Sequence, residues 1–348
     1  MAPVPDLPQA WPRPSRPRPI VCVGAGGIVE SAHLPAYRRI GLSVAGLYDI
    51  DRARAERVAA RFEVPTVHAT LAEVAAQPDV VFDLAVPARA VLSVLDALPE
   101  GATVLIQKPM GETLAEARRI VEACRAKRLV AAVNFQLRFA PNMLALGELV
   151  RSGALGTIVD FEVRVNVHTP WNDWPFLAGI PRHEVLYHSV HYLDLARSLL
   201  GEPRGVLSKA VRHPGLPAYS DTRSVTILDY GDALRAFVAA FHGHRYGRKH
   251  QASELKLEGT NGAAVARMGV NLDYPKGEPD SLEVCLAGGD WQRVPLRGSW
   301  FDEAFEGPMS NLQRFAAGED SVLITRVEDA LRTMEVVERC YGGAVDAG

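Results

Sequence analysis

The stretch PIVCVGAGGIV, residues 19–29, is a short β-branched run closed by glycines. Such a run is typical of a buried parallel strand that enters a tight turn, and IVESAHLPAYRRIG, residues 28–41, predicts the helix that should follow. Gly24 permits the turn, and Gly26 lets the backbone approach a pyrophosphate at the helix N-terminus. Val29 stands where the dinucleotide fingerprint has its third glycine, so this motif alone is a weak signal.

Strand and helix patterns alternate from here along the next hundred residues. Further strands are predicted at 42–49, 65–69, 80–87, 102–109 and 130–135, with helices at 51–62, 71–77, 88–98 and 113–128. This alternation predicts an α/β fold with a doubly wound parallel sheet, a Rossmann domain, over residues 19–145. Residues 1–18 are rich in proline, which disfavours regular structure, so we expect a disordered or loosely docked tail.

After about residue 145 the alternation stops. One further helix is predicted at 184–200 and a terminal helix at 325–341, with segments of alternating polarity between them at 224–231, 233–244, 252–259 and 281–288. Residues 146–348 are therefore expected to form an α+β domain on a large, mostly antiparallel open sheet. Its helices are too few to cover both faces, which predicts a homodimer or homotetramer packed through the sheet.

The composition excludes several classes of partner. The net charge of −3, with scattered Lys and Arg, gives no reason to expect nucleic acid or an anionic membrane. No apolar run approaches the ~20 residues of a membrane helix, and the start lacks a secretory pattern. The cysteines fit neither a disulfide framework nor CxxC metal spacing, which favours a cytoplasmic protein; they are Cys22, Cys124, Cys285 and Cys340.

Asp49 strengthens the prediction of a dinucleotide. It ends the second predicted strand, near the ~20-residue spacing at which an acid accepts hydrogen bonds from ribose hydroxyls. A carboxylate there repels a 2′-phosphate, so NAD is expected rather than NADP, although Arg52 leaves some room for NADP and Asp49 could instead cap the next helix. The predicted cofactor-binding residues are Gly24, Ala25, Gly26, Gly27, Ile28, Val29, Asp49, Ile50, Val86, Pro87, Gln107 and Lys108.

Five segments together resemble the Gfo/Idh/MocA family of NAD(P)-dependent sugar and polyol oxidoreductases. They are GAGGIVESAHLPAY, LYDIDRARAERVAARF, QKPMGETLAEARRIVEAC, NFQLRFAP and YHSVHYLDLARSLLGEP, in this order. The family strand-end motif is Glu-Lys-Pro, where this chain has Gln107, Lys108 and Pro109. The resemblance implies that Lys108 contacts a substrate hydroxyl and the nicotinamide. The charged ring would lower the pKa of Lys108 and favour proton transfer; the alternative is a lysine that orients the substrate.

The stretch HEVLYHSVHYLD, residues 183–194, predicts a polar stripe on a helix. At 3.6 residues per turn, His183, Tyr187, His191 and Asp194 project within an arc of about 80° between apolar flanks, as in a cleft wall. The resemblance implies that His191 is the acid/base histidine. Asp194 is expected to orient it or to pair with a backbone group. Tyr187 replaces a family aspartate, and it either carries protons or reshapes the pocket.

A metal is an alternative for these histidines. His188 and His191 lie three apart, and His242 and His244 share one face of a predicted strand, but no HExxH or CxxC motif or clustered carboxylate accompanies them. No metal is therefore expected, and His183 and His188 are expected to bond backbone carbonyls or to line the pocket. The predicted substrate-binding residues are Lys108, Arg138, Trp171, Trp174, Arg182, His183, Tyr187, His188 and His191.

Two features bear on the substrate. Trp171 and Trp174 would stack on a sugar ring or anchor their own loop. Arg182 and His183, together with the run FHGHRYGRKH, would favour a sugar acid such as a uronate or aldonate. The resemblance implies hydride transfer between NAD and a secondary alcohol of a sugar, polyol or sugar acid. Two alternatives stay open. One is a redox-neutral epimerase, isomerase or glycoside-cleaving enzyme with tightly bound NAD. The other is a nucleotide-sensing regulator, against which Lys108 and His191 argue.

Overall fold

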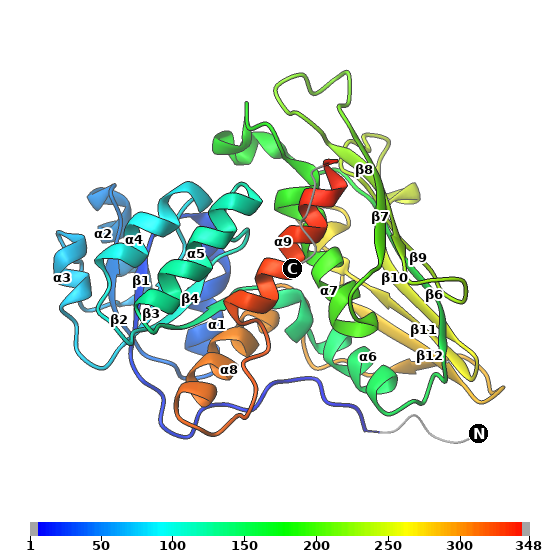
Figure 1. Ribbon diagram of the computed structural model, residues 1–348, viewed down its shortest axis with the longest axis horizontal. Helices are drawn as coiled ribbons and strands as arrows, with labels where there is room; N and C mark the ends of the chain where they lie inside the picture. Colours follow the sequence, from blue (N-terminus) through cyan, green and yellow to red (C-terminus); the bar gives the residue numbers. More distant parts are fainter. Residues whose placement is uncertain (1–5, 343–348) are drawn as a thin grey trace. The chain divides into compact units, whose positions relative to one another are not determined.

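The computed structural model describes residues 6–342, which divide by their contacts into two compact units that alternate along the chain (Figure 1). The Rossmann unit comprises residues 11–139 and 301–334. The sheet unit comprises, of the described residues, 6–10, 140–300 and 335–342. Part of the predicted proline-rich tail lies outside the described residues. Within the rest of it, the indole of Trp11 donates a hydrogen bond to Asp320 at 2.8 Å.

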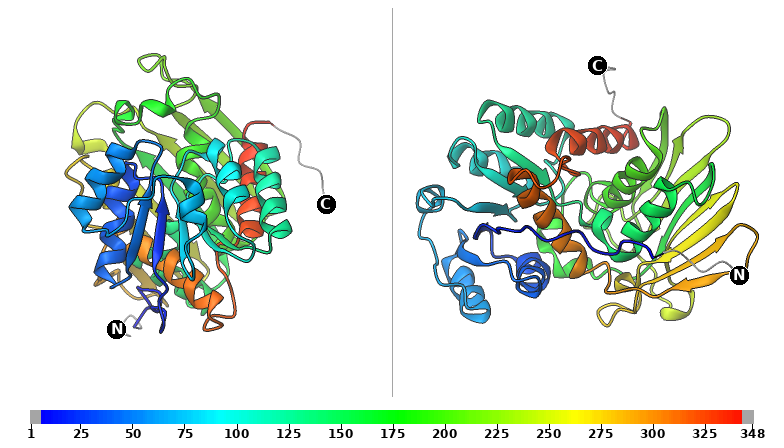
Figure 2. Two further views of the ribbon diagram at one scale, coloured as in Figure 1. Left: turned by 90° about the vertical axis from the view of Figure 1, so that its left-hand side faces the viewer. Right: turned by 90° about the horizontal axis from the view of Figure 1, so that it is seen from below.

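The Rossmann unit contains a parallel sheet of five strands within residues 11–139, and the left view of Figure 2 faces this unit. The order is β2-β1-β3-β4-β5, and the bounds are Ile20–Val23 (β1), Val44–Tyr48 (β2), Val81–Leu84 (β3), Thr103–Ile106 (β4) and Val130–Val133 (β5). The predicted doubly wound parallel sheet is confirmed. The strand predicted at 65–69 is wrong, because this segment forms an isolated bridge between Val67 and Leu47 instead.

Helices cover the Rossmann sheet. They are α1 (Leu34–Arg39), α2 (Arg52–Phe62), α3 (Leu71–Ala75), α4 (Val91–Ala97), α5 (Leu114–Ala126), α8 (Glu306–Ala316) and the first part of α9 (Val327–Cys340). Residues of α1, α2 and α8 share one buried core with Ile20 and Cys22 of β1. Because alternate residues of a strand point to opposite faces, these three helices lie on the same face of the sheet. Helices α4 and α5 pack against each other.

The sheet unit is built on strands in the order β13-β12-β11-β10-β6-β9-β8-β7, eight within residues 158–294. Their bounds are Ile158–Asn166 (β6), Gly205–Val211 (β7), Arg223–Asp229 (β8), Arg235–Phe241 (β9), Ala252–Gly259 (β10), Gly262–Arg267 (β11), Ser281–Leu286 (β12) and Gln292–Val294 (β13). All neighbours pair antiparallel except β6 and β9. The expected open, mostly antiparallel sheet is confirmed.

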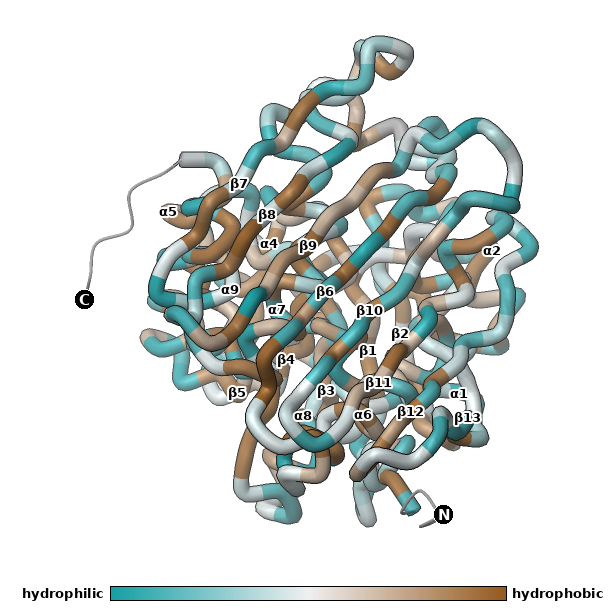
Figure 3. The backbone as a smooth tube through the Cα atoms, turned by 90° about the vertical axis from the view of Figure 1, so that its right-hand side faces the viewer, coloured by the Kyte–Doolittle hydropathy of each residue, from teal (hydrophilic) through white to brown (hydrophobic). Residues whose placement is uncertain are grey.

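Burial alternates along these strands, so one face of the sheet is covered. In β8, Ser224, Thr226 and Leu228 are buried, whereas Val225 and Ile227 are exposed. Figure 3 shows this sheet face-on, and hydrophobic positions recur along β7, β8 and β9. The helices of the unit are α6 (Pro141–Arg151), α7 (Val190–Leu200) and the last part of α9. Among residues 6–342, no helix combines the length and apolar character that crossing a membrane requires.

Three helices differ from the sequence-based expectation. Helix α6 was not predicted, although Pro141 at its first position is a favoured start. Helix α8 was also missed, because Gly, Pro, Ser and Asn in EGPMSNLQRFA lower its intrinsic helix propensity. The helix predicted at 184–200 begins with a π-helical turn, Val185–Ser189, and becomes α-helical at Val190.

Candidate active site

The predicted cofactor-binding residues lie at one edge of the Rossmann sheet. The glycine-rich loop, residues 24–29, follows β1. The other positions follow β2 (Asp49, Ile50), β3 (Val86, Pro87) and β4 (Gln107, Lys108). These four strands are neighbours and parallel, so their carboxyl ends meet at the same edge, where open α/β sheets bind ligands. The structure thus brings these residues together.

The glycines of this loop have different structural roles. Gly24 has a φ of +105°, and a Cβ added to it would lie 2.4 Å from the carbonyl oxygen of Ala85. The turn therefore requires glycine at this position. At Gly26 and Gly27 no heavy atom of the protein lies within 4 Å of the position of an added Cβ. This open space fits the close approach of a pyrophosphate to the backbone.

Asp49 fixes the loop between β1 and its helix. Its carboxylate accepts hydrogen bonds from the backbone N–H groups of Ala25 and Asp51, both at 2.8 Å. The cap of α2 is Asp51, whose side chain accepts from the N–H of Arg54 at 3.1 Å, so Asp49 does not serve as that cap. Arg54 Nη1 also lies 3.6 Å from Asp49.

Two neighbours of Asp49 bear on cofactor binding. Arg52, which the sequence suggested as a contact for a 2′-phosphate, forms an ion pair with Glu56 at 2.8 Å. The cation beside Asp49 is therefore Arg54 instead. Ile50 is 93% exposed and offers an apolar surface directly after β2.

A buried polar network that the sequence analysis missed lies beneath this edge. The Asp83 carboxylate contacts Nδ1 of His33 at 2.7 Å and accepts a hydrogen bond from the hydroxyl of Tyr37 at 2.9 Å. Burial, followed by the charge of Asp83, raises the pKa of Tyr37 and of Cys22, so both keep their protons. The available signal was an aspartate inside the apolar strand VFDL, because a buried acid needs partners.

This network extends to the end of β4 through Gln107. Its side-chain nitrogen lies 3.1 Å from Nε2 of His33, and its oxygen accepts from the N–H of Lys108 at 2.7 Å. The amide nitrogen of Asn134 also approaches Nε2 of His33, at 3.3 Å. Since amide nitrogens only donate, Nε2 accepts, and the proton of a neutral His33 is on Nδ1, facing Asp83. Gln107 therefore links the buried pair to the backbone of Lys108.

Replacing Gln107 by glutamate, the usual residue of the family motif, tests this network. A carboxylate cannot donate to Nε2 of His33, so the substitution would place two buried acceptors face to face. We expect Gln107→Glu to cost about 1–3 kcal/mol of stability. Thermal unfolding of the variant, with the wild type as control, measures the difference. A variant as stable as the wild type would contradict the assignment.

Lys108 lies two residues after the end of β4, and its side chain is half-buried. Desolvation lowers the pKa of Lys108 to about 8. A positively charged nicotinamide ring nearby would lower this pKa further. A substantial fraction of this lysine is thus neutral near physiological pH and able to accept a proton.

The polar stripe predicted on the helix at 184–200 is changed by the π-helical turn. The 3.6-residue spacing does not hold over Val185–Ser189, so the predicted arc of about 80° is wrong for the residues before α7. His191 and Asp194 lie on α7 and are buried, and the His191 ring packs edge-on to Trp300 with centroids 5.9 Å apart. Asp194 lies 4.0 Å from Nη1 of Arg197. Tyr187 lies within the π-turn and is half-buried.

His183 has a structural environment. Its Nδ1 lies 2.9 Å from the backbone carbonyl of Asp221, whose carboxylate accepts from the N–H groups of His183 and Glu184. The ring stacks on Tyr219 and meets Trp171 edge-on at 4.3 Å. Desolvation lowers the pKa of His183, so the imidazole is neutral. His183 therefore helps to hold the start of the helix.

Three other predicted substrate contacts are occupied within the protein. Trp171 is buried in a small cluster with Leu177 and Tyr219, so it anchors its loop, and Trp174 packs against the same cluster. Arg138 forms an ion pair with Asp329 at 2.7 Å. Arg182 forms a bidentate ion pair with Glu338 and lies over the ring of Tyr341. These contacts favour structural roles for Trp171 and both arginines.

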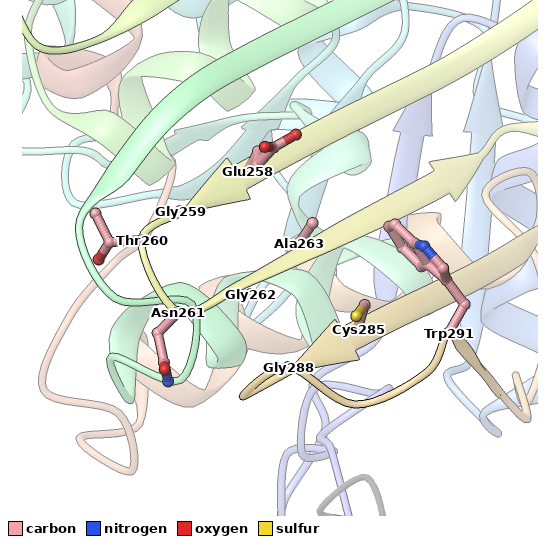
Figure 4. A pocket seen from close by; sticks show the side chains of 9 residues that line it. All are labelled: Glu258, Gly259, Thr260, Asn261, Gly262, Ala263, Cys285, Gly288 and Trp291. Carbon is pink, nitrogen blue, oxygen red and sulfur yellow. The ribbon is translucent and has the colours of Figure 1, made fainter.

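A hollow at the end of the sheet unit is lined by none of the predicted site residues. It surrounds the turn between β10 and β11 and is lined by Glu258, Gly259, Thr260, Asn261, Gly262, Ala263, Cys285, Gly288 and Trp291 (Figure 4). The lining contains one carboxylate and one thiol and no cationic side chain. This chemistry does not match a dinucleotide site.

Comparisons with known proteins agree with the strand-end site. Residues 19–135 match an oxidoreductase family with an NAD-binding Rossmann fold, and residues 143–265 match the GFO/IDH/MocA C-terminal domain. D-apiose dehydrogenase of Paraburkholderia graminis is 26% identical over 331 residues, covering 90% of this chain and 84% of the relative. Inositol 2-dehydrogenase 4 of Saccharopolyspora erythraea is 32% identical over 197 residues, covering 55% and 56%.

A solved structure shares the fold of the whole chain. Levoglucosan dehydrogenase in complex with NADH and levoglucosan superposes with a TM-score of 0.76 at 19% identity, covering 94% of this chain and 98% of that one. Fold and site define a dinucleotide-binding oxidoreductase. The chain belongs to the Gfo/Idh/MocA family, and its Rossmann unit is the NAD-binding domain of that family. The predicted family and cofactor are thus confirmed.

Proposed function

We propose that the protein oxidises a secondary alcohol of a sugar or polyol, with NAD as hydride acceptor. The observation that carries this proposal is Lys108, which follows β4 at the cofactor edge and has a lowered pKa of about 8. Relatives named D-apiose dehydrogenase and inositol 2-dehydrogenase support a carbohydrate substrate. When bound, NAD would supply the hydride acceptor, and the protein would take up the proton that the hydroxyl loses.

In our proposal, Lys108 and His191 have different roles in the transfer of that proton. The neutral amine of Lys108 accepts it, because a group with a pKa near the working pH transfers protons efficiently. His191 hydrogen-bonds the same hydroxyl through its imidazole. Asp194 and Tyr187 have supporting roles, Asp194 in holding α7 through Arg197 and Tyr187 in shaping the pocket.

We propose NAD rather than NADP as the cofactor. The Asp49 carboxylate lies at the end of β2, where it would accept from ribose hydroxyls and repel a 2′-phosphate. Arg54 lies close to Asp49, but its guanidinium also pairs with Asp51 at 3.1 Å. The negative charges of Asp49 and Asp51 therefore offset the single positive charge of Arg54.

A neutral substrate fits the arrangement better than a sugar acid. Arg182, the main cation expected to recognise an acid, has its guanidinium engaged by Glu338. Because this bidentate pair already neutralises the guanidinium charge, it leaves Arg182 a weaker attraction for a substrate carboxylate. Neutral sugars and polyols are therefore our first choice.

A substrate panel tests the proposal. Purified protein is incubated with NAD or NADP and with neutral sugars, polyols or sugar acids, and the reduced cofactor is followed by absorbance. We expect NADH from a neutral sugar or polyol and none with Lys108→Ala. Silence despite measured NAD binding, together with solvent hydrogen incorporated into a recovered sugar, would replace the proposal by the redox-neutral alternative. Silence without such exchange would favour the regulator.

We further propose that the outer face of the sheet unit packs against a second copy of the chain. Leu207, Val225 and Ile227 on β7 and β8 are 72%, 46% and 51% exposed. Neighbouring exposed aliphatic side chains on one sheet face are typical of a subunit interface. Sedimentation of the wild type and of Leu207→Lys/Ile227→Lys tests this, with dissociation expected in the variant.

A further inference from the structure

Three side chains with metal-binding atoms converge beside the π-helical turn of the sheet unit. Glu184 precedes the turn, His188 lies within it and His242 follows β9. Each offers one ligand atom, and these atoms lie within 4.8 Å of one another. Nε2 of His242 is 3.4 Å from Oε1 of Glu184, and the rings of His188 and His242 have centroids 4.0 Å apart. Within residues 6–342 no other trio of potential ligands meets this closely.

Two of these groups are buried with unsatisfied atoms. Glu184 and His242 are both 0% exposed. Oε2 of Glu184 and Nε2 of His242 have no hydrogen-bond partner within the described part of the chain. Burial of a carboxylate is unfavourable unless a positive charge and further contacts replace its hydration. A cation bound by both side chains would give Nε2 of His242 a partner and neutralise the buried carboxylate of Glu184.

Neighbouring hydroxyls orient the candidate ligands. Oγ1 of Thr169 lies 2.8 Å from Nδ1 of His242, and the hydroxyl of Ser189 donates to Oε1 of Glu184. With its proton on Nδ1, His242 donates to Thr169 and keeps the lone pair of Nε2 for a ligand. Such outer contacts on a ligating imidazole and carboxylate are a regular feature of metal sites.

We propose that Glu184, His188 and His242 bind a divalent first-row metal ion of the zinc type. Zinc bonds of about 2.0–2.2 Å put the ligand atoms of a tetrahedral site about 3.4 Å apart. The distance of 3.4 Å between Nε2 of His242 and Oε1 of Glu184 agrees with this value. Two imidazoles and one carboxylate suit zinc, and a set of three protein ligands leaves a fourth position for water or a substrate oxygen.

This site differs from the one considered in the sequence. That arrangement joined His188 and His191 with His242 and His244 and lacked a carboxylate. In the structure, Nε2 of His244 lies 3.1 Å from the carbonyl of Gly247, and Glu184, four residues before His188, completes the set instead. The proposal therefore departs from the expectation of no metal, which rested on missing motifs. The proposal does not depend on the identity of the substrate.

Zinc binding to the full-length, untagged protein tests the proposal. Chelator-treated protein is titrated with Zn²⁺, desalted and analysed by mass spectrometry for metal content, and Co²⁺ absorption reports the coordination geometry. We expect one ion per chain in the wild type. Glu184→Gln and His188→Ala/His242→Ala should each weaken zinc binding by about 100-fold or more. The matched control His168→Ala/His250→Ala removes two exposed imidazoles and should bind like the wild type.

The outcomes separate a built site from surface binding. Wild-type protein that retains no more zinc than His188→Ala/His242→Ala would overturn the proposal, and so would equal losses in the exposed-histidine control. If the double variant does not fold, Thr169→Val decides, because it removes the orienting hydroxyl and leaves all three ligands. A loss of about tenfold in zinc affinity is then expected. Unchanged affinity of Thr169→Val would also overturn the proposal.

Discussion

Lys108→Ala is expected to lower kcat/KM for alcohol oxidation by about 10²–10⁴-fold, the usual contribution of a positioned acid/base group. Oxidation requires the neutral amine, and desolvation sets the pKa of Lys108 to about 8. The wild-type rate should therefore fall about tenfold per pH unit below this pKa. In the reverse direction the ammonium donates the proton, so reduction should become faster as the pH falls. Initial rates of oxidation and of reduction from about pH 6 to 9 measure these two pH dependences.

The variant itself provides the decisive comparison. In Lys108→Ala the fall of the oxidation rate below about pH 8 should disappear. Affinity for NAD should change little if the lysine mainly transfers protons. Lys249→Ala is the matched control, because it removes an exposed lysine of the sheet unit. An unchanged pH profile in Lys108→Ala would show that another group titrates, and Lys108 would then serve to orient the substrate.

Gly24→Ala and Gly26→Ala form the second pair with large expected effects. A side chain at Gly24 meets both a positive φ and a carbonyl oxygen at 2.4 Å, so Gly24→Ala should cost about 2–5 kcal/mol. This cost should lower the melting temperature by about 5–15 °C. At Gly26 the added methyl group meets no protein atom, so Gly26→Ala should melt within about 2 °C of the wild type.

Gly26→Ala should weaken cofactor binding strongly for the little stability that it costs, whereas Gly24→Ala should cost mainly stability. The methyl group of Gly26→Ala would occupy the space through which a pyrophosphate approaches the backbone, so we expect the Kd for NAD to rise at least about tenfold, or 1.4 kcal/mol. Isothermal titration with NAD, beside calorimetric unfolding, separates the two effects. Wild-type affinity in a well-folded Gly26→Ala protein would mean that the pyrophosphate does not approach this glycine.

The parallel sheet of the Rossmann unit could be predicted from the sequence because its determinants are local. A β-branched strand, a glycine turn and a strand-end acid act within a few residues, and parallel pairing then brings such strand ends to one edge. Reliance on local sequence also explains why the strand predicted at 65–69 was wrong. PTVHA resembles a strand in composition, yet pairing partners decide whether it becomes one, and Val67 forms just a bridge to Leu47.

Features that depend on tertiary contacts were not predictable in the same way. The link from Asp83 through His33 to Gln107 joins β3, a helix and the end of β4, and sequence spacing does not reveal it. Likewise Glu184 and His242 are far apart in the chain and meet only in the folded sheet unit. The π-turn before α7 also changed which side chains share a helix face, because it departs from the 3.6-residue period.

The alternation of the two units along the chain has a consequence for biosynthesis. The parallel sheet ends at Val133, yet its β4 and β5 are covered by α8, and Ala132 pairs with Arg326. A ribosome delivers these late residues after the whole of 140–300. Since domains generally fold as units during synthesis, the nucleotide-binding unit must wait, partly uncovered, until residues 140–300 have been made and α8 has emerged. The helix that covers β4 and β5 thus arrives only after most of the sheet unit has been made.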